Sequence, residues 1–352
     1  DLFGIGLTGL RASQTQLAVT GQNITNVNTP GYSRQSALQA TQVPSYTGAG
    51  YIGNGTKVVD VSRIYNQFLT NQVRTSTSTN SEVQAFQSQL EQLNTLVSSS
   101  ATGITPCLQS YFDALQTAIE DPANLPARQL VLSEAEGLAS RFNTVHSSLN
   151  SQNQFISQQM TTLADQTSRL ATSIAQYNDS IAIASANGAQ PNDLLDARDE
   201  AVRQLCELVG ISVVQQDDNT LNIFVGSGQP LVVGKEASTL AVRSGSADPG
   251  RVEVVLKSGN SVQDITSLVS GGELGGLLKY RNDVLDPALN AIGRLALSIS
   301  SEFNSQQGQG LDLNGNAGAA LFNDVNSPVL VDGRSYARAT NSDPDAKLSV
   351  RI

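Results

Sequence analysis

Residues 2–35, LFGIGLTGLRASQTQLAVTGQNITNVNTPGYSRQ, form an amphipathic stretch with two charged side chains. Apolar side chains recur in it at alternating spacings of four and three residues, and these are Phe3, Leu7, Leu10, Leu17 and Ile24. Gln14 and Gly21 occupy the two other positions of this heptad seam. A seam this narrow is typical of a helix that pairs with other helices, not of one lying on a broad core. We therefore expect the five apolar residues to form an assembly interface.

This helix is expected to stop near Val27, because Pro30 cannot continue a helix and Gly31 permits a positive φ. An ordinary amphipathic helix with a Pro-Gly stop would satisfy these observations. The segment from Gly21 to Gln35, however, resembles the N-terminal signature of bacterial flagellar axial proteins, which are the rod, hook and hook-associated subunits. The signature residues that carry the resemblance are Asn23, Asn26, Asn28, Thr29, Pro30, Gly31 and Tyr32.

The composition favours thin packing of long helices. The 352 residues are enough for two or three domains, but only 39% are hydrophobic and 5% are aromatic. A net charge of −10 argues against binding to nucleic acid and to anionic membranes. No apolar run approaches the length of a transmembrane helix, and residues 1–4 do not resemble a cleavable secretory signal. Since Met160 is the only methionine, we expect a trimmed start or a fragment.

The pattern predicts an elongated, multidomain α+β protein in which a coiled-coil-like bundle of long helices carries β subdomains. The N-terminal helix should occupy residues 1–30, and an extended, Gly-rich connector residues 31–63. The helical bundle should comprise residues 64–210 and 273–308. A β-hairpin subdomain is expected at 211–272, and a truncated outer β domain at 309–352.

A very long helix is predicted from Pro126 to Asn187, with a four-residue stutter in its heptads between Ile156 and Met160. A helix that begins near Ile64 contains a polar middle, residues 75–81, which is either a weakly packed stretch or a break. The next helix should have one apolar face. From Leu274 the pattern is helical again, and its apolar face consists of Leu278, Leu285, Leu289, Ile292, Leu295, Ile299 and Phe303. The face expected for the shorter helix consists of Leu108, Phe112, Leu115 and Ile119.

The sequence predicts no catalytic, cofactor-binding or metal-binding residue, because His146 is the only histidine and the two cysteines form no metal-binding spacing. Cys107 and Cys206 are expected to be buried free thiols. The Gly-rich segments 4–9 and 48–53 match the residue spacing of the dinucleotide-binding motif, but neither lies between a strand and a helix as that motif requires. The segment from Asp312 lacks the glycine and glutamate of a calcium loop, so a turn is favoured. The acids Asp193, Asp196, Asp199 and Glu200, with Arg198 and Arg203, are interpreted as a solvated, paired helix face.

Three further motifs narrow the resemblance to the flagellar hook-associated protein 1 family, whose members join hook to filament. These motifs lie at 192–199, 275–278 and 310–316. The resemblance implies a structural subunit that assembles with its own copies into a ring or helical layer. It also implies contacts with the hook protein and the next hook-associated protein. Export through the flagellar type III pathway, without a cleaved signal, would place it in the extracellular flagellum. The family's second heptad helix, which holds the export chaperone, has no counterpart before Ile352.

The alternative function is an extracellular adhesin or antigen-like binding module on a coiled-coil stalk. Such a module has no need of the first helix followed by residues 28–32, and this feature separates the two hypotheses. An enzymatic function ranks third. A flagellar muramidase, for example, would need a pair of carboxylates in a cleft, and no segment singles one out.

Overall fold

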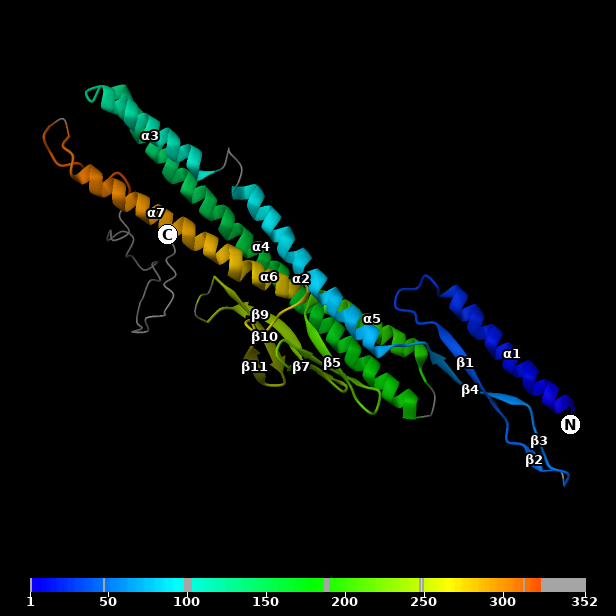
Figure 1. Cartoon of the computed structure of the whole chain (residues 1–352). Coiled ribbons are helices and arrows are strands. Elements are labelled where there is room, and N and C mark those ends of the chain that lie inside the picture. Colours follow the sequence, from blue (N-terminus) through cyan, green and yellow to red (C-terminus); the bar gives the residue numbers. More distant parts are fainter. Residues whose placement is uncertain are drawn as a thin grey trace. The chain divides into compact units, whose positions relative to one another are not determined.

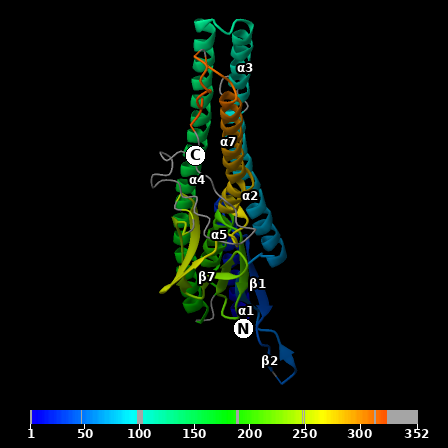
Figure 2. The same cartoon turned by 90° about the vertical axis from the view of Figure 1, so that its left-hand side faces the viewer.

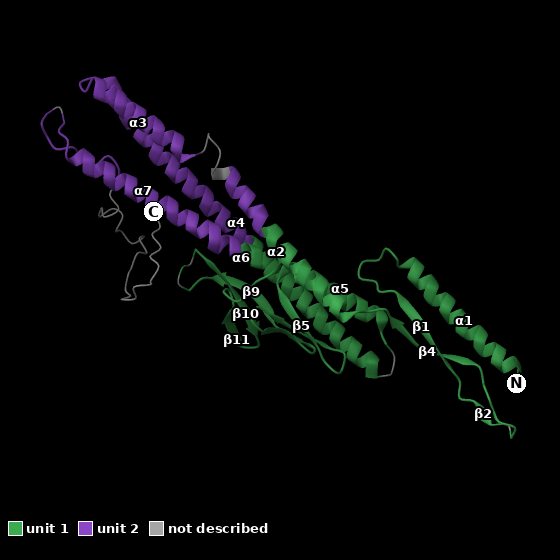
Figure 3. Ribbon diagram, viewed as in Figure 1, with its two compact units in different colours: residues 1–85, 159–278 green, residues 86–158, 279–352 purple. Residues whose placement is uncertain are grey.

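The structure is a computed structural model that describes residues 2–46, 48–97, 103–186, 190–246, 248, 250–312 and 314–323. It confirms a mixed α+β protein in which long helices alternate with small antiparallel sheets (Figure 1). Two compact units are present: residues 1–85 and 159–278 form unit 1, and residues 86–158 and 279–352 form unit 2 (Figure 3). This division differs from the five segments expected above, whose independence as domains stays a prediction.

Helices α1, α5 and α6 lie in unit 1, together with the first part of α2 and the last part of α4. Helix α1 ends at Thr25, two residues before the predicted stop. Helix α2 begins at Gln67 and continues without a break through the polar residues 75–81. The bounds are α1 Leu2–Thr25, α2 Gln67–Val97, α4 Leu125–Ala186, α5 Asn192–Leu208 and α6 Gly272–Tyr280.

The segment predicted to be an extended connector is a β-hairpin that packs on α1. Strands β1 (Gln35–Thr41) and β4 (Thr56–Arg63) pair antiparallel, with Gln35 opposite Arg63. Two short strands, β2 (Ser45–Tyr46) and β3 (Tyr51–Ile52), pair at its tip. Helix α1 lies along β1 and β4 (Figure 1). Residues 1–63 are called the N-terminal arm below.

Two further sheets complete unit 1. The predicted hairpin is present as the first pair of a meander in the order β5-β6-β7-β8, and β9, β10 and β11 form a second sheet. Leu221, Ile223 and Val225 of β6 are buried with a period of two, so one face of this strand packs against the core. The Ser168 hydroxyl of α4 is hydrogen-bonded to both the amide and the carbonyl of Leu240. The strands are β5 Ile211–Gln215, β6 Leu221–Val225, β7 Gln229–Val233, β8 Glu236–Ala237, β9 Thr239–Ser244, β10 Val252–Ser258 and β11 Ser261–Asp264.

In unit 2, helices α3 (Ile104–Glu120) and α7 (Asp286–Gly308) lie side by side with α4 (Figures 1 and 2). The predicted face of the shorter helix is only half covered, since Leu108 and Leu115 are partly buried but Phe112 and Ile119 are exposed. Tyr111 and Ala114 are the buried residues of this helix. The rings of Tyr111 and Phe112 both meet that of Phe303, with centroids 5.0 Å and 5.9 Å apart.

The seam predicted for α4 is confirmed, because the residues on it are buried along most of its 62 positions. Leu149, Ile156, Met160 and Ile174 are all fully buried. The boundary between the two units crosses α4 between residues 158 and 159, inside the predicted stutter. A change of heptad phase therefore coincides with the change of unit.

The last helix is present as predicted, but a π-helical turn, η1 (Arg281–Leu285), lies between α6 and α7. Most of the predicted face is covered: Leu278 and Leu285 are buried, Leu289, Ile292, Ile299 and Phe303 are partly buried, and Leu295 is exposed. An extra residue per turn changes the face that the following helix presents, which a period of 3.6 cannot reveal. The strand-like run at 329–331 and most of the predicted outer β domain lie outside the described residues.

Candidate functional site

The N-terminal arm is the candidate site because its helix has two apolar faces and only one of them is covered. The seam is exposed: Phe3 is 90% accessible and Leu17 71%, and Leu7, Leu10 and Ile24 are exposed as well. The opposite face carries Ala12, which is only 3% accessible. The fold of the arm therefore buries one face of α1 and leaves the predicted assembly interface exposed.

A close contact holds α1 on the hairpin. The Thr56 amide donates a hydrogen bond to the Thr8 hydroxyl, with N and Oγ1 3.3 Å apart. Gly55 has a φ of +95°, and a Cβ at this position would collide with the same hydroxyl. Glycine thus allows the turn before β4 to approach the helix.

Asn23, a signature residue, closes the loop that follows α1. Its Oδ1 accepts hydrogen bonds from the Tyr32 hydroxyl at 2.8 Å and from the Gln35 amide at 2.9 Å, and its Nδ2 donates to the Gln35 carbonyl at 2.9 Å. Burial and the nearby carboxylates of Asp193 and Asp196 raise the pKa of Tyr32, which keeps its hydroxyl a donor. The signature therefore ties the end of the helix to the first strand.

Two other signature residues stabilise the turn itself. The Thr29 hydroxyl donates to Asn26 Oδ1 at 3.2 Å, and the Thr29 amide donates to the Asn26 carbonyl at 2.9 Å. Asn28 and Pro30 lie in the same turn, for which Pro30 fixes φ.

The turn then meets helix α5. Gly31 has a φ of +79°, and a Cβ at this position would lie 2.7 Å from Cβ of Glu200. Two residues later, the Ser33 amide donates to Asp196 Oδ2 at 2.9 Å. Only glycine combines this backbone conformation with this proximity to a neighbouring helix.

A largely buried ion cluster completes this joint. Arg63 Nη1 lies 2.9 Å from Asp196 Oδ1 and 2.7 Å from Asp199 Oδ2, and Arg74 Nη2 lies 2.9 Å from Asp199 Oδ1. The four side chains are between 7% and 15% accessible. The interpretation of these acids as a solvated face is therefore wrong. It considered partners on their own helix, whereas the cations come from the end of β4 and from α2.

Part of the predicted paired face is present on α5. Arg203 forms ion pairs with Glu200 and Glu207 and remains 38% accessible. The hydrogen bond from Arg203 is the main cause of the lowered pKa of Glu200.

Arg198, which the sequence pattern also placed on the solvated face, is buried at 2% accessibility. Its Nη1 donates to Asn178 Oδ1 at 3.1 Å and to the Asn219 carbonyl. Asn178 in turn donates to the carbonyls of Leu221 and Gly234 and accepts from the Leu221 amide. Burial lowers the pKa of Arg198 to about 10. A signal was available, because Arg198 occupies an apolar seam position of its helix.

Among the described residues, no group of three or more His, Cys, Asp or Glu side chains could hold a metal ion. The Asp312 carboxylate accepts hydrogen bonds from the amides of Asn314 and Asn316, which confirms the predicted turn. Gly4–Gly9 lies within helix α1, so it cannot be a strand-to-helix phosphate loop.

Of the two thiols, Cys206 is buried as predicted and Cys107 only partly. Burial raises the pKa of Cys206 to about 11, so this thiol is a poor nucleophile at neutral pH. None of the described helices is both long and apolar enough to cross a membrane.

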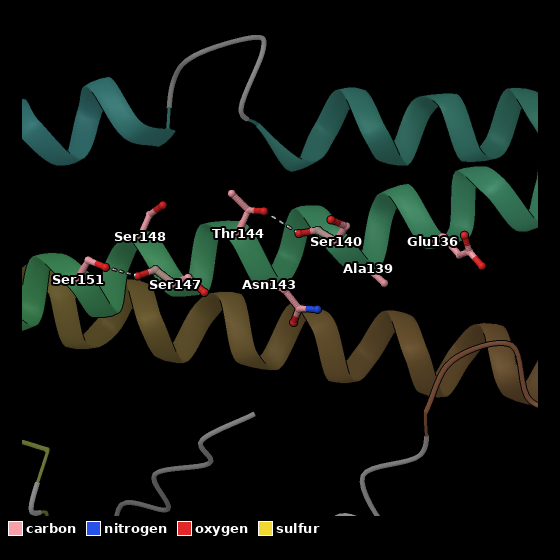
Figure 4. Close-up of a pocket in the computed structure, with 8 residues that line it drawn as sticks. All are labelled: Glu136, Ala139, Ser140, Asn143, Thr144, Ser147, Ser148 and Ser151. Atoms are coloured by element: carbon pink, nitrogen blue, oxygen red, sulfur yellow. Dashed lines mark hydrogen bonds between the residues drawn. The ribbon is translucent and has the colours of Figure 1, made fainter.

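A hollow of about 810 Å³ lies along α4 of unit 2, with α7 beside it (Figure 4). Glu136 is its only ionisable residue, and the Thr144 and Ser151 hydroxyls donate to backbone carbonyls of their own helix. A single carboxylate, beside hydroxyls that are hydrogen-bonded within their own helix, does not form an acid–base pair.

Comparisons with known proteins agree with this geometry. A family model described as "Flagella basal body rod protein" matches residues 4–32, which comprise α1 and the signature. This match places the arm in the class of flagellar axial proteins. A second family model, "Flagellar hook-associated protein FlgK helical domain", matches residues 90–322. The chain belongs to the flagellar hook-associated protein 1 (FlgK) family.

Individual relatives support this assignment. Flagellar hook-associated protein 1 of Salmonella typhimurium is 34% identical over 356 residues, covering 100% of this chain and 63% of the relative. The Escherichia coli protein is 34% identical over 326 residues, covering 92% of this chain and 60% of its own length. The solved structure of the flagellar hook junction protein FlgK from Burkholderia pseudomallei aligns with a TM-score of 0.67 at 35% identity, over 71% of this chain and 46% of that one. This chain thus spans less than two thirds of the length of these relatives.

Proposed function

We propose that this chain is a non-catalytic structural subunit that joins hook to filament in the bacterial flagellum. The observation that carries the proposal is the exposed seam of α1, on a helix whose other face is already packed and whose residues match flagellar rod proteins. A fold that leaves a heptad seam uncovered is suited to helix–helix contacts with further chains. The assembly interface is proposed to consist of Phe3, Leu7, Leu10, Leu17 and Ile24.

The partners follow from the family and the named relatives. They are copies of this chain in a ring or helical layer, the hook protein below and the next hook-associated protein above. Export by the flagellar type III pathway without a cleaved signal, and a chaperone on a C-terminal helix beyond these residues, belong to the same proposal. The signature residues 23–32 serve in it to tie the seam-bearing helix to the hairpin and to α5. No observation in the structure favours the stalked adhesin.

The test is complementation of a deletion strain with the full-length gene carrying Leu10→Asp. Leu10 is exposed in the single chain, so the charge costs little until the seam is buried. Burial of an unpaired charge at a helix–helix contact costs several kcal/mol in every subunit. We expect Leu10→Asp cells to secrete the subunit but to make hooks without filaments in electron micrographs.

The matched control is Ser13→Asp, which adds the same charge at an exposed position of α1 outside the seam. It should give normal filaments. Normal filaments with Leu10→Asp would contradict the assigned interface. Absence of the wild-type chain from isolated flagella would contradict the function itself.

A further inference from the structure

A second feature of the arm is a polar hollow between α1 and β1. It has a volume of about 360 Å³ and lies entirely within unit 1. Its walls include Gln16, Val19 and Thr20 from the helix, and Arg34, Ser36 and Ala37 from the strand side. It lies apart from the exposed seam, and Asn23 and Gln35, which also line it, connect it to the signature loop and to Asp193 of α5.

Three hydrogen-bond donors in this hollow are unused. The side chains of Arg34, Gln16 and Ser36 make no hydrogen bond or ion pair with any described residue, whereas the neighbouring Asn23 and Gln35 side chains are engaged. The backbone of Arg34 is fixed, because its carbonyl accepts the Ile64 amide at 2.8 Å. A guanidinium, an amide and a hydroxyl around one hollow match the acceptor atoms of a carboxylate, which an arginine can bind with two parallel hydrogen bonds.

The distribution of charge indicates where the carboxylate comes from. Residues 1–63 carry four Lys or Arg and two Asp or Glu, whereas residues 64–352 carry 17 and 29. The arm is thus cationic on an otherwise strongly acidic chain. Exposed acids such as Glu120, Asp121 and Glu136 have no partner among the described residues. Complementary charges on one chain favour head-to-tail contacts between copies.

We propose that the hollow containing Arg34 binds an exposed Asp or Glu side chain of a second copy of this chain. The contact rests on the proposed function, since it needs copies assembled side by side. It adds a polar, register-fixing contact to the apolar seam, because a bidentate guanidinium–carboxylate pair is directional where an apolar seam is not.

The test uses the full-length protein in flagella, with p-benzoylphenylalanine in place of Val19, which lines the hollow without supplying a polar contact. After irradiation of isolated flagella, mass spectrometry should find two copies joined at a peptide that contains Asp or Glu. Adding Arg34→Gln should lower the yield of this product at least fivefold. Lys57→Gln, which removes an exposed charge from the same hairpin outside the hollow, should change it less than twofold.

A second measurement does not depend on the photoreactive residue. The fraction of hooks that carry filaments should fall several-fold in Arg34→Gln cells and remain near wild type in Lys57→Gln cells, with Arg34→Lys between them. Cross-links within one chain or to a different flagellar protein would overturn the proposal, as would equal yields with and without Arg34. In those cases wild-type chain in the flagella would still support the proposed function, and its absence would remove both.

Discussion

At the scale of residues, the signature holds the N-terminal helix against β1 and α5 of the same chain. Asn23 ties the end of α1 to β1, while Gly31 and Ser33 bring the turn against Glu200 and Asp196 of α5. Arg63 returns from the hairpin to the same pair of acids. Removing one partner of a buried ion pair costs about 3–5 kcal/mol, because the other charge is left buried and unpaired, so this joint is sensitive to the loss of any one of these charges.

Gly31→Ala should weaken this joint. Alanine at a φ of +79° costs roughly 1–3 kcal/mol, and its Cβ would also displace Glu200. Hydrogen exchange of residues 2–41 should therefore accelerate. Gly234→Ala is the matched control, because Gly234 also has a positive φ but nothing lies within 4 Å of an added Cβ. Its effect should be smaller and should leave the arm unchanged; an unchanged arm in Gly31→Ala would show that the contact with Glu200 does not hold the joint.

At the scale of elements, the helices differ in how many of their faces are covered. Helix α4 buries a seam along most of its length, whereas among the residues of α1 only Ala12 is buried. Helical stability in proteins comes mainly from packing, so the two should differ in their local free energy of opening.

In the isolated chain we expect amides of α1 to exchange at least tenfold faster than those of residues 163–181 in α4. Binding of other chains to the seam should protect α1, so the difference should shrink in assembled flagella. The measurement is hydrogen exchange followed by mass spectrometry on both samples. Equal protection of the two helices in the monomer would mean that the hairpin alone stabilises α1 and that its seam adds nothing.

What the sequence predicted follows from the range of the interactions involved. The long helix, its seam and the β5–β6 hairpin were predictable because each depends on neighbours within a few residues. The pairing of Arg63 with Asp196 was not, because 133 positions separate the two side chains. The heptad seam of α1 could be predicted from the spacing of its apolar residues, but only the structure shows that the opposite face packs on a hairpin.

Two details of the helices could not be read from the spacing of apolar residues. For α3, Tyr111 and Ala114 are buried, whereas Phe112 stays exposed although its ring also meets that of Phe303. For the last helix, the π-turn at 281–285 shifts the phase without any proline or glycine inside it to mark the place. Both outcomes depend on tertiary packing, which overrides local periodicity.

At the scale of the whole molecule, the chain combines a cationic arm with an acidic remainder and assembles no cluster of metal-binding side chains among its described residues. Its proposed function is mechanical and depends on contacts between subunits, not on catalysis. Stability should therefore come from packing and ion pairs alone, without help from a bound ion.

Treatment of the purified full-length protein with EDTA should leave its thermal midpoint within about 1 °C. Metal analysis should find less than about 0.1 equivalent of zinc, since a bound ion stabilises a fold by mass action and its removal would lower the midpoint. Added nucleotide should not shift the midpoint either. A stoichiometric metal would contradict the prediction that the protein has no metal site, and a clear shift with nucleotide would contradict the prediction that it has no nucleotide site.

The two ends of the hairpin contact α5 at almost the same place. Ser33 and Arg63 both contact Asp196, and Gln35 lies opposite Arg63 in the ladder. The contacts of Ser33 and Arg63 with Asp196 do not depend on the length of the hairpin between them. The chain can therefore gain or lose residues at the tip, positions 43–54, without moving α1 relative to α5, because the contact of Gly55 and Thr56 with Thr8 is kept. The length of the arm and the strength of its attachment to α5 are thus set by different residues. Either can change, in evolution or by design, without a change in the other.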